Sequence, residues 1–222
     1  MKIKKVLKWV GIVLLIIIAI ILINTIRNFV IVKGLQSKIS EYKASTNYAI
    51  KLTSKVGDET QLLLDYYVKD NKKAGVMNRI SKDQNVKVSF FRREITDDGE
   101  KYDVFWETPE EKTVQINTVG LYDAQIYNSL ETDNTWQTIL ACTLARIKST
   151  ECNGKKCYKI TNYMSPLFLN GTEKNEAYVE KETGLGIRIV MDDQVTDKEY
   201  SFGNVDDSVF VEPNIGEYKI KE

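Results

Sequence analysis

Ser40 and Lys43 stand three residues apart, in the Ser-x-x-Lys order in which a lysine can activate a serine nucleophile. The companion Ser-Asp-Asn and Lys-Thr-Gly motifs of the penicillin-binding enzymes do not occur in the sequence. A pattern with only two defined residues arises by chance in many chains, and this one follows directly on a long apolar segment. We therefore assign no catalysis to it.

Cys152 and Cys157 flank an Asn-Gly turn signal and form the most specific local pattern in the chain. A two-residue turn at Asn153-Gly154 would place Cys152 opposite Lys155 and the two cysteines diagonal to each other on one face. A four-residue loop would instead place them directly opposite, at a separation that a disulfide can span. Outside the cytoplasm we expect a disulfide between Cys152 and Cys157.

Other residues suited to chemistry are few. The sequence contains no histidine, which excludes His-based triads and His metal sites. The carboxylate pairs Asp192-Asp193 and Asp206-Asp207 would point to opposite faces of a strand or lie in turns, and neither arrangement makes a good acid–base pair. Three cysteines are too few for a four-cysteine zinc site. We expect a protein that is not an enzyme and holds no metal and no cofactor.

Charge is distributed unevenly along the 222 residues, although the formal net charge is zero. Residues 1–33 carry six basic and no acidic side chains, so the remaining 189 residues carry 25 basic against 31 acidic ones, a net charge of −6. A mildly acidic body lacks the basic face that neutralises phosphates. The composition therefore argues against nucleic acid as a partner.

A membrane-spanning helix is the strongest single prediction from the sequence. No charged or strongly polar residue occurs from Trp9 to Ile23, and the apolar run extends to Ile26 before Arg27. At 1.5 Å per residue these eighteen positions span roughly 27 Å, close to the hydrocarbon thickness of a bilayer. The run is longer than the core of a cleaved signal peptide, and no A-x-A-like cleavage site follows it. We expect an uncleaved signal anchor rather than a buried core helix.

The charges on either side of this segment predict its orientation. Four lysines lie within the first eight residues, whereas only Arg27 and Lys33 follow closely on the other side. The positive-inside rule then keeps the N-terminus in the cytoplasm and places the C-terminal part outside the cell membrane. We divide the chain into a cytoplasmic tail, a transmembrane anchor, a stalk or first helix and an outer β domain: 1–8, 9–28, 29–45 and 46–222.

The stalk prediction depends on helical spacing at the start of the outer part. Val32, Leu35, Ile39 and Tyr42 recur every three or four residues, and Gly34 would allow a kink or break.

After Thr46 the apolar period changes to two, which is typical of half-buried strands. Turn signals separate the alternating runs, so we expect eight to eleven short antiparallel strands joined mostly by hairpins. The alternating sets are Tyr48/Ile50/Leu52, Leu62/Leu64/Tyr66/Val68, Val86/Val88/Phe90, Tyr102/Val104/Trp106, Val114/Ile116, Tyr158/Ile160, Ile187/Ile189/Met191 and Tyr200/Phe202. The turn signals are Asp97-Asp98-Gly99, Asn153-Gly154, Asn170-Gly171 and Thr183-Gly184-Leu185-Gly186.

One stretch breaks the strand pattern and predicts an inserted helix. Trp136, Leu140 and Leu144 recur every four residues, and Asp133 or Asn134 could cap the helix at its start. Cys142 on this helix is expected to be a small buried core residue.

The C-terminal third resembles the LolA-like superfamily, the group of the periplasmic lipoprotein carrier and related lipoprotein domains. The segment Glu180-Lys181-Glu182-Thr183-Gly184-Leu185 with Arg188 is similar to the acidic-Lys-x-Thr-Gly-Leu-x-x-Arg turn between two strands of that group. The ending Phe210-Val211-Glu212-Pro213 is similar to its Phe-x-x-Pro close. The resemblance implies an α+β fold: an incomplete antiparallel β-barrel around an apolar cavity, covered by helices. Unlike the carriers, this chain is tethered by a helix.

Two functions from different classes follow from these features. In the first, the outer domain binds a lipid, an acyl chain or a lipoprotein in the bacterial cell envelope. Trp136, Leu140 and Leu144 would then form a lid over the cavity, whose expected lining includes Tyr48, Ile50, Val104 and Trp106. In the second, the same fold is a filled scaffold, a non-enzymatic adaptor or regulator that binds a cell-wall or envelope-signalling protein. A gap of several hundred cubic ångströms favours the first function, and inward positions filled by large side chains favour the second.

Overall fold

The computed structural model describes residues 2–81, 85–97, 99–119, 130, 134–161 and 175–221, and every structural statement concerns these residues. They group into two compact units. One unit consists of Met1–Ser40 with Tyr127–Gly186, and the other of Glu41–Ile126 with Ile187–Glu222. No linker-like stretch in the sequence marks this division, and the single outer domain over 46–222 stays a prediction.

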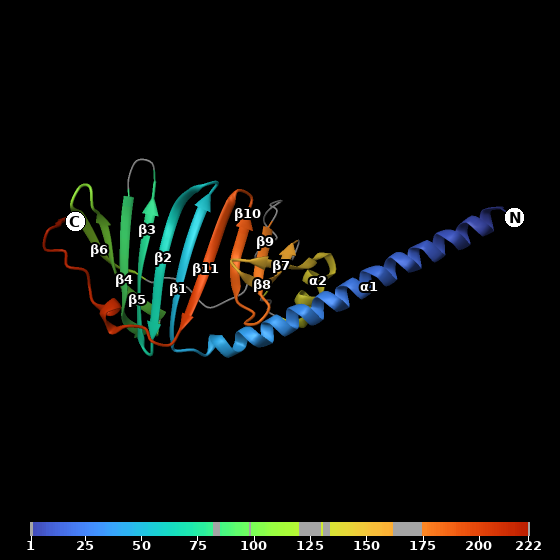
Figure 1. The fold of residues 1–222 in the computed structure, drawn as a ribbon, viewed down its shortest axis with the longest axis horizontal. Coiled ribbons are helices and arrows are strands. Elements are labelled where there is room, and N and C mark those ends of the chain that lie inside the picture. The colour runs from blue at the N-terminus through green and yellow to red at the C-terminus, as the bar shows by residue number, and fades with distance from the viewer. Residues whose placement is uncertain are drawn as a thin grey trace. The chain divides into compact units, whose positions relative to one another are not determined.

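The helix α1, Lys2–Lys43, begins in the lysine-rich N-terminus and runs without interruption through the apolar segment and the expected stalk (Figure 1). Its side chains from Leu7 to Ile23 are exposed, and the helix is long and apolar enough to span a membrane. Beyond them a buried stripe begins, with the three-and-four spacing of a helix face that packs on a core. The stripe consists of Thr25, Asn28, Val32, Leu35 and Ile39.

The expected helical spacing at Val32, Leu35 and Ile39 is thus confirmed, whereas Gly34 neither kinks nor breaks the helix. A glycine in a helix interior lowers the stability of the helix by about 1 kcal/mol relative to alanine. The packed residues on both sides of Gly34 offset this loss.

The unit that contains the first part of α1 also has a short helix and three strands, whose order is β9-β8-β7 with antiparallel pairing. Its core joins Val32 and Leu35 of α1 to Ile147, Ile160 and Val179 of the strands. Both helices therefore cover one face of this small sheet. The elements are α2 (Thr135–Leu144), β7 (Arg146–Cys152), β8 (Lys155–Thr161) and β9 (Asn175–Glu180).

The second unit is a larger sheet with the order β12-β6-β5-β4-β3-β2-β1-β11-β10. In the described residues its two ends do not pair with each other, so the predicted half-open antiparallel sheet is confirmed. The one parallel pair, β12 with β6, was not predicted. The strands are β1 (Asn47–Val56), β2 (Glu59–Lys69), β3 (Lys72–Ile80), β4 (Asn85–Thr96), β5 (Gly99–Thr108), β6 (Thr113–Val119), β10 (Gly186–Met191), β11 (Gln194–Phe202) and β12 (Lys219–Lys221).

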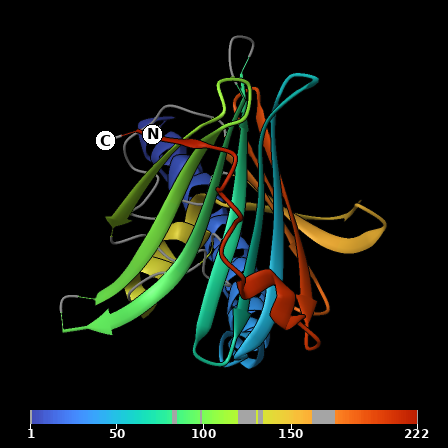
Figure 2. The same cartoon turned by 90° about the vertical axis from the view of Figure 1, so that its left-hand side faces the viewer.

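The C-terminal segment follows this sheet after β11. A 3-10 turn, η2 at Asp207–Phe210, lies beside β3, and the chain ends in β12 against β6 (Figure 2). Lys69 and Lys72 donate to Asp207 at 2.7 and 3.2 Å. These hydrogen bonds hold the pKa of the Asp207 carboxyl below its usual value. In this turn Asp206 is the cap and Asp207 is the ion-pair partner, which agrees with the expectation that the two carboxylates lie in a turn.

An aromatic ladder crosses one face of the larger sheet. Tyr48 lies 6.5 Å from Tyr66, Tyr66 stacks on Phe90 at 6.1 Å, and Phe90 meets Tyr102 edge-on at 6.1 Å between ring centroids. Tyr66 and Phe90 come from β2 and β4, with Gly75 of β3 between them in register. Because Gly75 has no side chain, the two rings meet across it, and the middle of this face is filled.

Replacing Gly75 with alanine should destabilise the larger unit by about 1–3 kcal/mol, because a Cβ there overpacks the ladder. That atom would lie 2.3 Å from Cζ of Phe90 and 2.9 Å from the carbonyl oxygen of Asp65. Urea unfolding of the detergent-solubilised protein, read by proteolysis, measures the loss. In a Phe90→Leu background the penalty should shrink, since the ring is the nearer obstacle. An unchanged penalty in that background would contradict the ladder geometry.

Candidate functional site

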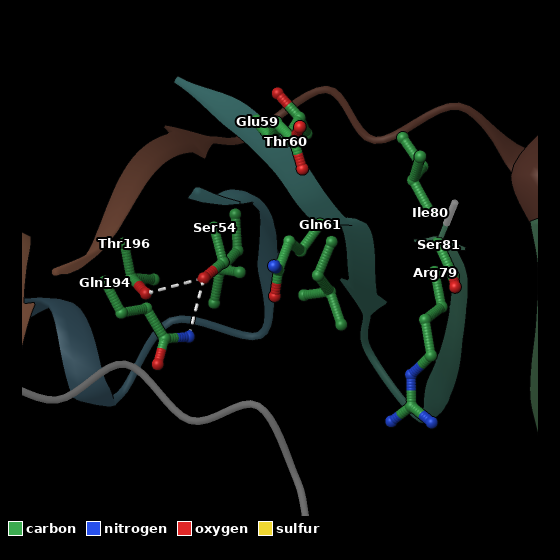
Figure 3. A pocket seen from close by; sticks show the side chains of 11 residues that line it. Ser54, Glu59, Thr60, Gln61, Arg79, Ile80, Ser81, Gln194 and Thr196 are labelled. Carbon is green, nitrogen blue, oxygen red and sulfur yellow. Dashed lines mark hydrogen bonds between the residues drawn. The ribbon is translucent and has the colours of Figure 1, made fainter. Parts of the chain in front are cut away.

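A hollow of about 980 Å³ opens on the ladder's face of the larger sheet, towards the ends of β1, β2, β3 and β11 (Figure 3). The register pairs Ser54 with Leu62 and Leu62 with Arg79, so these side chains share one face. Three of the eleven lining side chains are apolar. The lining consists of Leu52, Ser54, Glu59, Thr60, Gln61, Leu62, Arg79, Ile80, Ser81, Gln194 and Thr196.

A small hydrogen-bond group organises one side of the hollow. Ser54 is buried, and its Oγ accepts hydrogen bonds from Nε2 of Gln194 at 2.8 Å and from Oγ1 of Thr196 at 3.2 Å. Figure 3 shows the three side chains joined by these bonds, with Arg79 across from them. The group keeps two side chains of β11 oriented towards β1, which fixes the wall of the hollow at that side.

Arg79 brings a positive charge to the opposite side of the hollow. Its side chain is exposed, and no carboxylate among the described residues lies within ion-pair distance of it. Glu59 is the single carboxylate in the lining, on the neighbouring strand. Leu52 and Leu62 supply the apolar part of the surface between Arg79 and the Ser54 group. The site therefore combines an apolar patch, neutral hydrogen-bonding groups, one guanidinium and one carboxylate.

The four residues expected to line a cavity lie on this same face but not in the hollow. Ile50 and Val104 are buried in the row that also contains the ladder, and Tyr48 is a member of the ladder itself. Trp106 is 39% exposed and pairs with Val88, one row away. The cavity lining expected from the alternation stays a prediction; the polar residues of the hollow come from strand ends that only the register brings together.

The helix α2 forms as predicted, but its apolar stripe faces outwards. Asn134 caps it, and Oδ1 of Asn134 accepts a hydrogen bond from the backbone of Gln137 at 2.9 Å. The side chains of Trp136, Leu140 and Leu144 are 75%, 67% and 60% exposed. The lid over a cavity therefore stays a prediction. Asp133, the other expected cap, lies outside the described residues, as do Asp98 and Asn170-Gly171 of the predicted turns.

The opposite face of α2 is the packed one, because its small side chains meet α1. Thr138, Ala141 and Cys142 are buried, and Asn28 of α1 is fully buried beside them. Nδ2 of Asn28 donates to the carbonyls of Cys142 at 3.0 Å and Ala145 at 2.8 Å. These bonds satisfy carbonyls at the C-terminal end of α2, which have no partner within the helix. They also set which face of α2 turns inwards.

The β7–β8 hairpin resolves the two alternatives for the cysteines. Asn153 and Gly154 have φ of 51° and 74°, and the register pairs Cys152 with Lys155 and Thr150 with Cys157. This is the two-residue turn, with the cysteines diagonal on one face. All three cysteines of the chain are buried and in the thiol form. The Cys152–Cys157 disulfide therefore stays a prediction.

Burial makes these thiols poor nucleophiles. It raises the pKa of Cys142 to about 11, and it raises the pKa of Cys157, with Cys152 and Glu180 adding to the effect. The thiolate is the reactive form, so both remain largely protonated at neutral pH. Ser40 donates to the carbonyl of Ser37 at 2.5 Å within α1, which is a structural role. None of these groups supports an activated nucleophile.

Comparison with known proteins assigns neither a family nor a function to this chain. No protein-family profile matches the chain, and no curated protein matches it. Among solved structures, the chain is similar to a DUF1329 family protein from Desulfovibrio piger, with a TM-score of 0.33 and 12% identity over 85% of this chain and 97% of the other. A likeness at that level transfers no function. The function is therefore argued from the chain's own residues.

Proposed function

We propose that this protein is a membrane-anchored binding protein of the bacterial cell envelope. The apolar N-terminal part of α1 serves as a signal anchor, with its lysine-rich end in the cytoplasm and both compact units outside. The four lysines before the span against two basic residues after it support this orientation. The LolA-like relationship belongs to the same proposal, and the sequence around Thr183-Gly184-Leu185 supports it.

The hollow is the proposed binding site, and its ligand is an amphiphile with an acyl chain and an anionic head group. The observation that carries this is the combination of Arg79 with Leu52 and Leu62 in one concave surface. Arg79 offers the fork of donors that suits a carboxylate or phosphate. Burial of the chain on the leucines contributes roughly 0.8 kcal/mol per CH₂. A volume of about 980 Å³ lies within the usual range for small-molecule sites. The role is binding, without chemistry.

Photolabelling of the full-length protein in nanodiscs with a photoactivatable fatty acid tests this proposal. Peptides from β1 to β3 of the wild type should carry the label. Leu62→Glu should lower their labelling at least about tenfold, the equivalent of ~1.4 kcal/mol, because it places a carboxylate where the chain and head group lie.

Leu63→Glu is the matched control, since the neighbouring residue points to the other face of β2 and does not line the hollow. It should leave the labelling unchanged. The membrane span of α1 should be labelled in all variants, which gives an internal standard. Labelling confined to α1 in the wild type, or equal labelling of Leu62→Glu, would contradict the proposed site.

A second candidate function is that of an adaptor or regulatory scaffold. The aromatic ladder favours it, because Tyr66, Phe90 and Tyr102 fill the middle of the face that a barrel-type carrier would keep open. In that case the sheet presents an edge or loop to an envelope protein, and the hollow has no lipid occupant. Absence of label from β1 to β3, with α1 labelled normally, would favour this function.

A further inference from the structure

The exposed stripe of α2 is an apolar surface that the binding site does not use. Trp136, Leu140 and Leu144 lie on one face of the helix at four-residue spacing, and all three are more than half exposed. The helix carries no charged residue from Thr135 to Leu144. A solvent-facing helix side usually carries charges, so this side has the composition of a surface with an apolar partner.

The position of α2 along α1 points to the partner. Asn28 bonds the carbonyls at the C-terminal end of α2, and Nη2 of Arg27 donates to the carbonyl of Ile147 at 3.3 Å. Asn28 lies two residues beyond Ile26, where the apolar run ends, which is about 3 Å along the helix. The head-group layer on each side of the hydrocarbon core is about 5–8 Å thick. The end of α2 is therefore held at the level of that layer.

The charges next to α2 fit the same location. Arg146 and Lys148 follow the helix and are exposed, and Arg27 is exposed on the adjoining part of α1. Basic residues at this level are attracted to anionic lipid head groups. Tryptophan is the residue most enriched at the boundary between head groups and acyl chains, and leucine suits the layer just below it.

We propose that α2 is an interfacial helix that seats Trp136, Leu140 and Leu144 in the outer leaflet of the membrane that α1 spans. The proposal rests on the membrane anchoring under the proposed function. Ile26 and Val30 of α1 are also more than half exposed, so apolar surface continues past the span at this level. The contact gives the first compact unit a second attachment to the bilayer and restricts its rotation about α1.

The three tryptophans of the chain allow a direct test, because they lie in three different places: Trp9 in the span, Trp106 in β5 and Trp136 in α2. Three full-length variants each retain one tryptophan and have phenylalanine at the other two positions. Each is reconstituted in vesicles of phosphatidylcholine and phosphatidylglycerol, with and without lipids brominated near the glycerol end of the acyl chains. Trp136 should emit at shorter wavelength than Trp106 and lose intensity with the brominated lipids, whereas Trp106 should not.

The same set separates failure of the inference from failure of the anchor. Quenching of Trp9 without quenching of Trp136 would overturn the interfacial helix and leave the anchor intact. Absence of quenching at Trp9 would overturn the anchor and the inference together. As a further check, Leu140→Glu with Leu144→Glu in the Trp136-only variant should restore emission in brominated vesicles and admit the aqueous quencher acrylamide. Unchanged lipid quenching in this variant would show that the stripe does not hold the helix in the membrane.

Discussion

Replacing Gly184 with alanine should destabilise the first compact unit by about 3–5 kcal/mol, through the sum of backbone strain and a steric clash. Gly184 lies in the turn between β9 and β10 with φ of 75°, and its N–H donates to the carbonyl of Glu180 at 2.9 Å. The helix α1 passes directly over this turn. A Cβ at position 184 would lie 2.3 Å from the carbonyl oxygen of Leu35 and 3.1 Å from the backbone nitrogen of Ile39.

The clash is with backbone atoms of a long helix, so no side-chain rotation relieves it. Gly154→Ala is the matched control, because Gly154 has φ of 74° in the same unit and nothing within 4 Å of its added Cβ. Gly154→Ala introduces the backbone strain without the clash, so it should lower the free energy of unfolding by about 1–2 kcal/mol. Urea unfolding of the detergent-solubilised protein, followed by proteolysis, compares the two variants. Equal losses would mean that α1 does not pack on this turn.

Replacing Asn28 with aspartate should cost a similar amount, about 3–5 kcal/mol, because it buries an unpaired charge against two acceptors. Nδ2 of Asn28 donates to the carbonyls of Cys142 and Ala145, and the residue is fully buried. Its Oδ1 has no hydrogen-bond partner among the described residues, so an added negative charge finds no donor there. A carboxylate at this position faces carbonyl oxygens where the amide had offered two N–H donors.

Gln36→Glu makes the same change from amide to carboxylate two turns further along α1. It serves as a control at a less buried position. Nε2 of Gln36 makes one bond, to the carbonyl of Leu130 at 2.8 Å, and the side chain is partly solvent-exposed. We expect a loss of about 1 kcal/mol from this variant in the same unfolding assay. Protease sensitivity within α2 should rise in Asn28→Asp and not in Gln36→Glu. If α2 stays protected in both, Asn28 does not hold the helix.

Alternation predicted the larger sheet well because most of its strands have one buried face. The set at Tyr48, Ile50 and Leu52 became β1, and those around Tyr66, Val88 and Val104 became β2, β4 and β5. The strand β3 was missed. Its sequence Lys72–Ile80 has no alternation and includes Gly75, which is required by the aromatic contact above it and not by the strand itself.

The face of α2 is the clearest case where periodicity identified an element but not its environment. A stripe with four-residue spacing normally packs on a core, and Trp136, Leu140 and Leu144 therefore suggested a lid. The packed face instead consists of Thr138, Ala141 and Cys142, small residues that allow close approach of α1. Four-residue spacing shows that a stripe is apolar but not what it contacts, so the sequence alone could not distinguish a stripe that packs on protein from one that is exposed.

The hollow was not predictable because its residues become neighbours only through strand register. Ser54 and Leu62 form the last regular pair of β1 and β2, and a β-bulge between Ser54 and Lys55 shifts the register of the pairs that follow, Lys55 with Thr60 and Val56 with Glu59. Arg79 is the penultimate residue of the strand that was missed, and Gln194 begins β11 on the other side of β1. Short-range patterns do not specify such pairings, because a slip of one residue moves every side chain to the opposite face.

Native mass spectrometry of the full-length protein, released from detergent micelles, tests the central claim of an amphiphile in the hollow most directly. Wild type and Leu63→Glu should retain the same discrete adduct, and Leu62→Glu should have lost it, so that the difference excludes lipids bound along α1. Dissociation of the adduct should yield an anionic species with an acyl chain. A wild-type mass without adduct, or the same adduct on Leu62→Glu, would contradict the claim and leave the scaffold function as the better account.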